Sequence, residues 1–518
     1  MKRKKIYGYV STLFALGLLL GCTKDLLTDA TENDDSDSSR REAFFSLIVA
    51  AFDGNAGSRA VSSPTPGENG DGSLTGTADE NAVADLNVFF FDAGDDGTGF
   101  RPGINADAET AVATPVFTFY TDELTAVTLS DGTKGYTTGS RKVTEMDLEL
   151  EIGKTYDVLV LANYGQKYKP SDGSDLTLAA LRSSTIGMDI PLYSTTTGNL
   201  LMTSASAGDT ITVKGNTAMN PTTVSVTLER LAARVDYRVQ SGYLALGSAG
   251  ADKGEYDKVA ITHAVLCNNY TGQEYLFKCV SPRILSIRDW NLMIPIYLGD
   301  EMTNANGIAN NYVLTPDMTA GRFAEDHFET ATYYPYFSPN PDATYDYWQR
   351  LTPQNSDVTA YDQYYTLTYT RENTSRTEDL TDLSKSAACV VFRAEYTPYG
   401  MESSKDKTFY WYDNKAYATL EDITKANPEL NGINDTEEDL KKHNIRKYPD
   451  GVCFYTYYIR HADDGDSKTE SPMEHATVRN NVYRLDVQSI YGPGGAGDIV
   501  VSVSIAPWGK TIDVYPDF

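Results

Sequence analysis

The residue types that most often carry out catalysis are sparse and scattered in this chain. Its five histidines stand apart, and neither an HExxH nor a GxSxG pattern is present. Residues 492–497 fit the GxGxxG spacing of a dinucleotide loop, but a strand pattern follows them where a helix is required. Loop aspartates such as Asp95, Asp463 and Asp466 have the chemistry to bind calcium, although acidic turns in an acidic chain are usually only hydrated. We therefore predict no catalytic, cofactor-binding or metal site and no enzymatic activity.

One cysteine lies in a context that predicts covalent modification. A basic segment at residues 2–5 precedes an apolar run at residues 6–20, which is too short to cross a bilayer. Gly21 and Cys22 follow directly, as in a bacterial lipobox, where the cysteine receives lipid and becomes the new N-terminus. We predict a lipoprotein signal at residues 1–22 and a lipid anchor on Cys22. An ordinary secretory signal is the alternative.

A lone arginine follows the first strand-like segment. Residues 44–52 (FFSLIVAAF) are apolar on both alternating faces, and one face carries Phe45, Leu47 and Val49. The loop that follows is rich in small residues, and Arg59, before Ala60, is its one basic residue. A cut after Arg59 would separate the whole of residues 23–59, an acidic tether and this strand, from the body of the chain.

Composition limits the possible partners. The 518 residues have a formal net charge of −28, and a field of this sign repels phosphate backbones, so we expect no nucleic-acid partner. Hydrophobic residues make up 41% of the chain, enough for a large core.

The cysteines after Cys22 lack metal-ligand spacing. Cys267 and Cys279 flank a hairpin-like segment, which leaves open whether they form a disulfide or stay as buried thiols.

The remaining pattern is that of a mostly β protein. Short alternating apolar runs are separated by Gly, Asp, Asn and Ser turns. The strongest strand candidates are residues 85–92, 154–163, 222–239, 388–395, 452–460, 481–489 and 498–505. Helical periodicity occurs at residues 176–182 and 436–443. We predict two β-sandwich domains in tandem, an N-terminal one at residues 60–220 and a C-terminal one at residues 221–518.

Several of these segments together resemble the major fimbrial subunits of Bacteroidales, the fimbrillins or type V pilins. The shared features include the lipobox at Cys22, the strand segment that closes at Arg59, the sequence DLNVFFFD after it, and LERLAARVDYRV further on. The most specific feature is the C-terminal run from Tyr455 to Trp508. Residues 281–380 carry no matching motif, so their fold is left open.

The resemblance implies a subunit of transthyretin-like, Greek-key β-sandwiches that is exported as an outer membrane lipoprotein. An Arg-specific, gingipain-like protease would cut the Arg59–Ala60 bond. Identical subunits would then polymerise head to tail by donor-strand exchange into an extracellular fimbrium that supports adhesion. Fimbrial anchor and tip subunits would be the further partners, and Cys22 would carry the lipid.

Two C-terminal segments alternate as a donated strand would. For residues 499–505, donation and a place in the chain's own sandwich are equally open. For residues 510–518, in which Ile512 and Val514 share a face, we favour donation because free termini move easily. The free tail favours a stalk subunit over a tip or accessory subunit. From a different class, the alternative is a surface lipoprotein that binds glycan through aromatic side chains, such as Tyr455 and Tyr457, and never polymerises.

Overall fold

The computed structural model describes only part of the chain. The described residues are 43–51, 76–93, 114–129, 134–142, 150–170, 173, 175–186, 199–204, 209–270, 273–277, 348–354, 364–373, 383, 387–461, 474–494 and 499–507. Cys22, Arg59, Ala60, Ile512 and Val514 lie outside them, as does Cys279.

The first sheet is built around the strand at the start of the described chain. Among the described residues, ten strands form it in the order β3-β2-β7-β9-β11-β1-β5-β4, with β10 also paired to β7 and β6 also paired to β1. Their bounds are β1 (Phe44–Ala51), β2 (Leu86–Asp92), β3 (Phe117–Thr121), β4 (Thr125–Thr128), β5 (Lys134–Thr137), β6 (Arg141–Lys142), β7 (Thr155–Ala162), β9 (Met202–Ser204), β10 (Asp209–Thr212) and β11 (Thr222–Arg230). Strand β1 runs parallel to β11 and antiparallel to β5 and β6.

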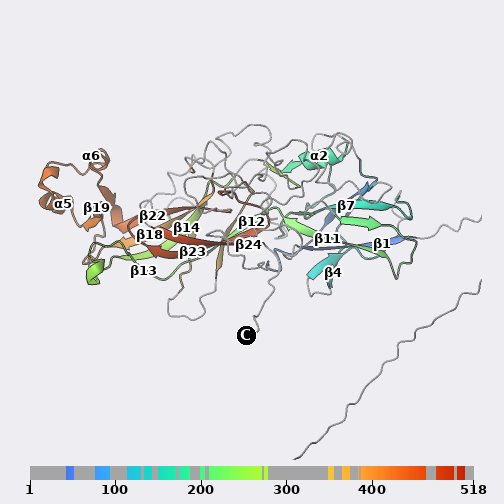
Figure 1. Ribbon diagram of the computed structural model, residues 1–518, viewed down its shortest axis with the longest axis horizontal. Helices are drawn as coiled ribbons and strands as arrows, with labels where there is room; N and C mark the ends of the chain where they lie inside the picture. Colours follow the sequence, from blue (N-terminus) through green and yellow to red (C-terminus); the bar gives the residue numbers. More distant parts are fainter. Residues whose placement is uncertain are drawn as a thin grey trace, which may run out of the picture. The chain divides into compact units, whose positions relative to one another are not determined.

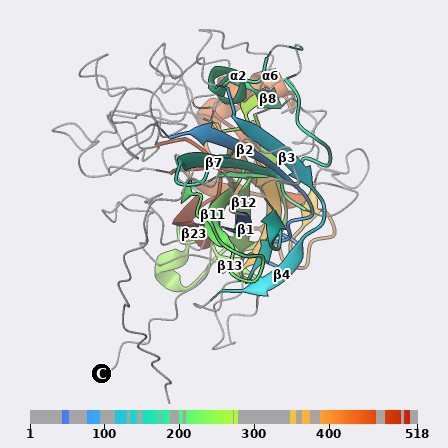
Figure 2. The same ribbon diagram turned by 90° about the vertical axis from the view of Figure 1, so that its right-hand side faces the viewer.

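This sheet curls so that β1 faces strands far from it in the sheet order. The ring centroid of Phe45 on β1 lies 5.7 Å from that of Phe90 on β2 and 5.9 Å from that of Phe119 on β3. The short connection of residues 122–124 also joins β3 to β4, the two ends of the sheet order. Figure 2 shows β1 enclosed by other strands of its own sheet. The curled sheet therefore acts as both layers around one apolar core.

A second apolar cluster covers the other face of β2 and β7. It contains Phe89 and Phe91 of β2, Leu159 and Leu161 of β7, and the short helix α2 (Leu178–Ser183). Thr177 caps this helix, since its hydroxyl accepts a hydrogen bond from the Ala180 amide at 3.0 Å. Strand β8 (Thr185–Ile186) follows the helix in the chain and pairs antiparallel with β15 (Glu274–Tyr275).

The second half of the described chain forms a sandwich of two sheets, which we call the second sandwich because the curled first sheet acts as the first. Within the described residues, one sheet has the order β17-β12-β23-β24 and the other β13-β14-β18-β22, with β16 paired to β14. Figure 1 shows β12, β23 and β24 side by side. The bounds are β12 (Ala233–Arg238), β13 (Tyr243–Leu244), β14 (Lys258–Cys267), β16 (Gln349–Arg350), β17 (Tyr365–Thr370), β18 (Cys389–Thr397), β22 (Val452–Tyr458), β23 (Asn481–Ile490) and β24 (Ile499–Pro507). Side chains from both sheets meet in one core, among them Val235, Leu485, Phe392 and Tyr455.

A small insertion separates β18 from β22. It consists of β19 (Phe409–Tyr412), β20 (Lys415–Tyr417), α5 (Leu420–Ala426), α6 (Glu437–Lys442) and β21 (Arg446–Tyr448), with short 3-10 turns at Pro428–Leu430 and Pro449–Gly451; a further 3-10 turn lies at Ala251–Lys253. A reciprocal capping box between Thr419 and Asp422 begins α5. Among the described helices, none has the length and apolar character needed to cross a bilayer.

The predicted mostly β fold is confirmed, with two differences in detail. The strand expected at residues 222–239 is two strands, because the chain leaves the first sheet after Arg230 and enters the second at Ala233. Strand β11 pairs with β1, although the predicted boundary at residue 220 had assigned it to the second domain. The passage between the two sheets therefore falls at Leu231–Ala232.

Candidate functional site

Strand β1 fills a slot in the first sheet. Phe45, Leu47 and Val49, the residues that the sequence placed on one face, are at most 1% exposed and belong to the core. Phe44 and Ile48 on the other face are half-buried. Seven residues of β1 pair in parallel with β11, from Phe45 opposite Thr222 onward. The strand is thus buried by its side chains and hydrogen-bonded along both edges.

Two side chains extend the backbone pairing of β1. The Asn216 amide accepts a hydrogen bond from the Phe44 N–H at 2.6 Å and donates one to the Phe44 carbonyl at 2.8 Å. It is itself held by the Thr222 hydroxyl, to which it donates at 2.8 Å. Thr138 does the same for Leu47: its hydroxyl accepts from the Leu47 N–H at 3.1 Å, and its N–H donates to the Leu47 carbonyl at 3.0 Å. These contacts recognise main-chain groups and not the side chains of β1.

Strand β24 has a different position. It pairs antiparallel with β23, from Ile490 opposite Ile499 to Asn481 opposite Pro507, and is the last strand of its sheet in the described part of the chain. Of the two alternatives for residues 499–505, the structure has the strand in the chain's own sandwich. Ile512 and Val514 lie outside the described residues, and their role as a donor stays a prediction.

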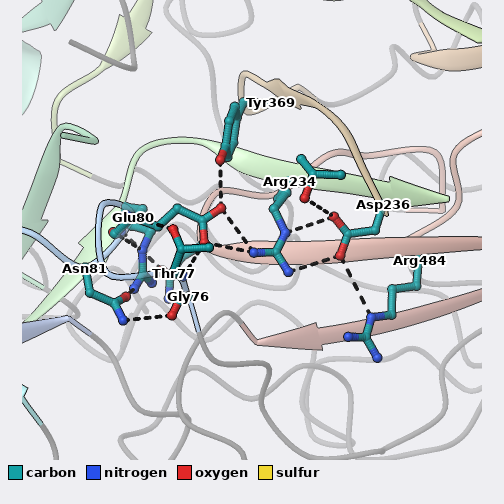
Figure 3. Close-up of polar contacts among 11 residues, drawn as sticks. Gly76, Thr77, Glu80, Asn81, Arg234, Asp236, Tyr369 and Arg484 are labelled. Carbon is teal, nitrogen blue, oxygen red and sulfur yellow. Dashed lines mark hydrogen bonds and ion pairs between the residues drawn. The ribbon is translucent and has the colours of Figure 1, made fainter. Parts of the chain in front are cut away.

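A buried ionic cluster joins the segment before β2 to the second sandwich (Figure 3). The Arg234 guanidinium lies 2.9 Å from the Glu80 carboxylate and donates to the Asp236 carboxylate at 3.0 Å. Tyr369 donates its hydroxyl hydrogen bond to Glu80 at 2.7 Å. Arg230, which is fully buried, donates to the Glu80 carbonyl at 2.9 Å and to the Asn81 side chain. The cluster fixes the segment at residues 76–81, which follows the predicted processing site in the chain.

Burial and charge act in opposite directions on these groups. Burial disfavours the ionised form of Glu80, but Arg234 and hydrogen bonds from Thr77 and Tyr369 outweigh it, so the pKa of Glu80 lies below its usual value. Burial lowers the pKa of Arg230 to about 9. Both groups therefore carry their charges near neutral pH, and the Glu80 carboxylate forms its salt bridge with Arg234.

A second buried ionic cluster lies beside β15 and the start of β23. Arg479 donates to the Glu372 carboxylate at 3.0 Å and to the Leu276 carbonyl at 2.9 Å. Arg371 lies 3.3 Å from the Glu274 carboxylate. Burial raises the pKa of Glu274 to about 7, although Arg479 and Arg371 pull it down. Because Leu276 packs against β2 and β7, this cluster also connects the two halves of the described chain.

The structure bears on three chemistries that the sequence raised: metal binding, a disulfide and glycan stacking. No group of three or more His, Cys, Asp or Glu side chains able to hold a metal occurs among them. Cys267, Cys389 and Cys453 are buried; Cys279 is not described, so a disulfide with Cys267 stays open. Tyr455, a candidate for glycan stacking, is 2% exposed and donates to the Gly492 carbonyl at 2.8 Å, a packing role. The calcium candidates Asp95, Asp463 and Asp466 lie outside the described residues.

Sequence reasoning missed the side chains that hold the slot and the ionic clusters. Asn216 and Thr138 stand in polar, turn-like sequence, where nothing marks a residue that binds a strand 172 or 91 positions away. The ionic clusters had no clear signal either. Arg234 and Asp236 alternate with the apolar Val235 and Tyr237, a pattern that predicts a polar face in contact with water.

Comparison with known proteins gives one family match. Residues 446–511 match the family model described as major fimbrial subunit protein type IV, fimbrillin, C-terminal. This segment begins at β21 and takes in β22, β23 and β24. No curated protein matches the sequence.

Solved structures were matched over most of the chain at low sequence identity. A provisionally assigned cell adhesion protein from Parabacteroides distasonis has 12% identity and a TM-score of 0.40, covering 91% of this chain and 99% of its own. A fimbrilin from Porphyromonas gingivalis has 12% identity and a TM-score of 0.37, with the same coverage. The tip fimbrial protein Mfa3 of that organism has 12% identity and a TM-score of 0.35, covering 90% of this chain and 100% of its own.

The fimbrillin C-terminal match overlaps the run from Tyr455 to Trp508, on which the sequence resemblance chiefly depended. The segment contains β23 and β24 of one sheet of the second sandwich and β22 of the other sheet, so it belongs to the core of the fold. Residues 446–511 of this chain are therefore similar to the C-terminal region of the fimbrillin family of major fimbrial subunits.

Proposed function

We propose that this chain is a structural subunit of a cell-surface fimbrium, in the stalk, and that it polymerises by exchanging β1 for a strand of another copy. The fimbrillin match at residues 446–511 supports a fimbrial subunit. The observation that carries the exchange step is the position of β1, a buried strand between β11 and β5 that is the first described strand of the chain. Export as a lipoprotein anchored through Cys22, and cleavage after Arg59 by an Arg-specific protease, are parts of the same proposal.

The chain's connectivity makes β1 removable by a single cut. The strand enters its sheet before every other described strand, so its covalent link to the rest of the fold runs through residues 52–75. Arg59 lies within this link. Strand β2 and the Glu80 cluster come after it, so a cut at Arg59 would leave them attached to the body.

An emptied slot would be unfavourable in water. Burial of Phe45, Leu47 and Val49 contributes roughly 1.5–3 kcal/mol each, on the order of 7 kcal/mol together. The facing edges of β11 and β5 would also lose their backbone partners. A strand supplied by a second copy would restore both the apolar contacts and the ladder, as in β-strand addition.

The polymer would be open-ended. The slot and the donated strand are different surfaces, so the contact between copies is head to tail and does not close on itself. We assign donation to residues 510–518, with Ile512 and Val514 directed into the slot, because β24 pairs with β23 over its length and moving it would break that sheet. A stalk subunit must both accept and donate; a tip subunit would lack one of the two functions.

Proteolysis of the purified precursor tests this function. Trypsin treatment of the wild-type chain should yield a ladder of SDS-resistant oligomers, and Arg59→Ala should abolish it. Arg41→Ala is the matched control, because a cut at Arg41 would leave β1 joined to the body, and its ladder should equal that of the wild type. A wild-type chain that stays monomeric after complete cleavage at Arg59 would overturn the proposal.

The donating end can be tested in the same assay. Ile512→Asp should stop the ladder at the level of the single subunit while leaving cleavage at Arg59 intact. If Ile512→Asp chains polymerise as the wild type does, residues 510–518 are not the donor. A chain that accepts a wild-type donor but never donates would be a tip subunit, the alternative assignment.

A further inference from the structure

The strands on one side of β1 depend on it for their place in the sheet. Here we call the described parts of residues 125–142 the flap; it comprises β4, β5 and β6. In the part of the chain that the structure describes, β4 pairs with β5, β5 pairs with β4 and β1, and β6 pairs with β1. Strand β1 is therefore the bridge through which the flap's strands join the rest of the sheet.

The flap has few other described attachments. Arg141 donates to the Thr121 hydroxyl at 3.2 Å and lies 3.7 Å from Glu123, next to the point where the flap leaves β3. Tyr136 is half-buried and packs against the core below β1. The four residues of β4 are mostly exposed. A strand pair with so little buried surface is marginal without a neighbouring strand.

The opposite side of the slot is held by core side chains. Val224, Val226 and Leu228 of β11 lie in the core, and β11 also pairs with β9 at its end, from Leu228 to Arg230. Asn216 continues this edge by one residue, since it binds both main-chain groups of Phe44 and is braced by Thr222. We call β11 and Asn216 together the fixed edge.

We propose that the slot takes up an extended strand of a second copy in two steps: the strand docks first on the fixed edge, and the flap then closes over it. This rests on the proposed strand exchange. The fixed edge keeps its shape without β1, so it offers an ordered row of backbone groups to an incoming strand. The flap reaches its sheet position by pairing with a strand already in place, and Thr138 then binds the main chain of that strand as it binds Leu47 in β1.

Hydrogen exchange tests the state of the flap. The full chain is cleaved at Arg59, the released strand is removed by gel filtration in mild urea, and amide exchange is compared with the uncleaved chain. The amides of Thr137 and Thr138 should exchange at least about a hundredfold faster in the strand-free chain, whereas those of β2 and β7 should keep their protection. Adding a synthetic peptide of residues 43–51 should restore the slow exchange. Protected flap amides in the strand-free chain would overturn the proposal.

Binding kinetics test the order of the steps. A fluorescein-labelled peptide of residues 43–51 is mixed with strand-free chain at nanomolar concentration, where polymerisation is slow. Asn216→Ala should lower the association rate constant about tenfold, because the fixed edge is used in the docking step. Thr138→Val should raise the dissociation rate constant about fivefold and leave association unchanged, because Thr138 acts after docking.

Asn220→Ala is the matched control in the loop of Asn216, and it should change neither constant. If both Asn216→Ala and Thr138→Val alter the same constant, the two-step order is wrong. The outcomes separate this inference from the proposed function. Oligomer ladders without the predicted kinetics would leave the function standing and overturn the two steps; the predicted kinetics without ladders would do the reverse.

Discussion

Strands β1 and β24 have opposite positions in their sheets. Strand β1 is hydrogen-bonded along both edges, to β11 on one side and to β5 and β6 on the other. Strand β24 is bonded along β23, and within the described residues its other edge has no partner strand. Both strands lie near an end of the sequence. From sequence alone, β1 was a candidate for removal and β24 was one of two candidates for donation.

The difference indicates how each end of the chain would take part in the proposed strand exchange. A central strand such as β1 holds its sheet together, so its removal leaves a defined vacancy that a similar strand can fill. An edge strand such as β24 can gain a neighbour without being moved, and moving it would leave β23 without its partner. The N-terminal strand is therefore suited to replacement, and β24 is suited to stay in its own subunit.

The largest expected effect comes from the core of β1. Phe45→Ala in the uncleaved chain should lower the free energy of unfolding of the first sheet by about 4 kcal/mol, since Phe45 is 1% exposed and contacts Phe90 and Phe119. Urea denaturation followed by hydrogen exchange of β2 and β7 measures it. After cleavage at Arg59 and removal of the strand, variant and wild type should unfold alike. A difference that persists would mean that residue 45 acts outside the slot.

The strands with strong apolar alternation were predictable from sequence, and the flap was not. The expected strands at residues 85–92, 154–163 and 481–489 correspond to β2, β7 and β23, because buried strands need apolar side chains at every or every second position. Strands β4 and β6 are short, polar and exposed or half-buried, and they exist as strands because β1 and β5 hydrogen-bond to them. Local sequence cannot show a strand whose stability comes from a distant partner.

Only part of the slot could be read from the sequence. The alternation of residues 44–52 grouped Phe45, Leu47 and Val49 on one face without showing which face is buried, and the parallel pairing with β11 depends on a contact across almost 180 residues. The break at Leu231–Ala232 was missed because apolar residues continue on both sides of it. One apolar run can serve two sheets when the chain passes directly from one to the next.

The Glu80 cluster joins the segment before β2 to the second sandwich, so a substitution there tests whether the two halves of the described chain stabilise each other. Glu80→Gln should lower the free energy of unfolding by about 3 kcal/mol, because it leaves Arg234 buried with less compensating charge. The pKa of Glu80 is lowered in the folded chain, so the stabilisation by its charge is complete above the usual pKa and is lost as the pH falls through the folded value. Glu123→Gln is the control: Glu123 pairs with Arg141 at 3.7 Å while 83% exposed, and the loss should be below about 0.5 kcal/mol.

The second ionic cluster should give the opposite pH dependence. The pKa of Glu274 is raised to about 7, chiefly by burial, so protonated Glu274 stabilises the fold. This contribution is complete below the usual pKa of 4.5 and is lost as the pH rises through about 7. Relative to Glu274→Gln, the wild type should lose about 3 kcal/mol of unfolding free energy across this range. A control with Glu438→Gln, at an exposed position, should run parallel to the wild type; a flat difference for Glu274→Gln would contradict the assignment.

Apart from the control variants, the smallest expected loss of unfolding free energy comes from a substitution in β24. Val501 is half-buried, lies opposite Val487 on β23 and packs against the core of the second sandwich. Val501→Ala should therefore cost about 1 kcal/mol of unfolding free energy, less than Phe45→Ala because less surface is removed from water. The cost should be the same before cleavage at Arg59, after it, and within the polymer, since β24 stays with β23 in each state. If the cost disappears in the cleaved chain, β24 has left its sheet, and it, rather than residues 510–518, supplies the exchanged strand.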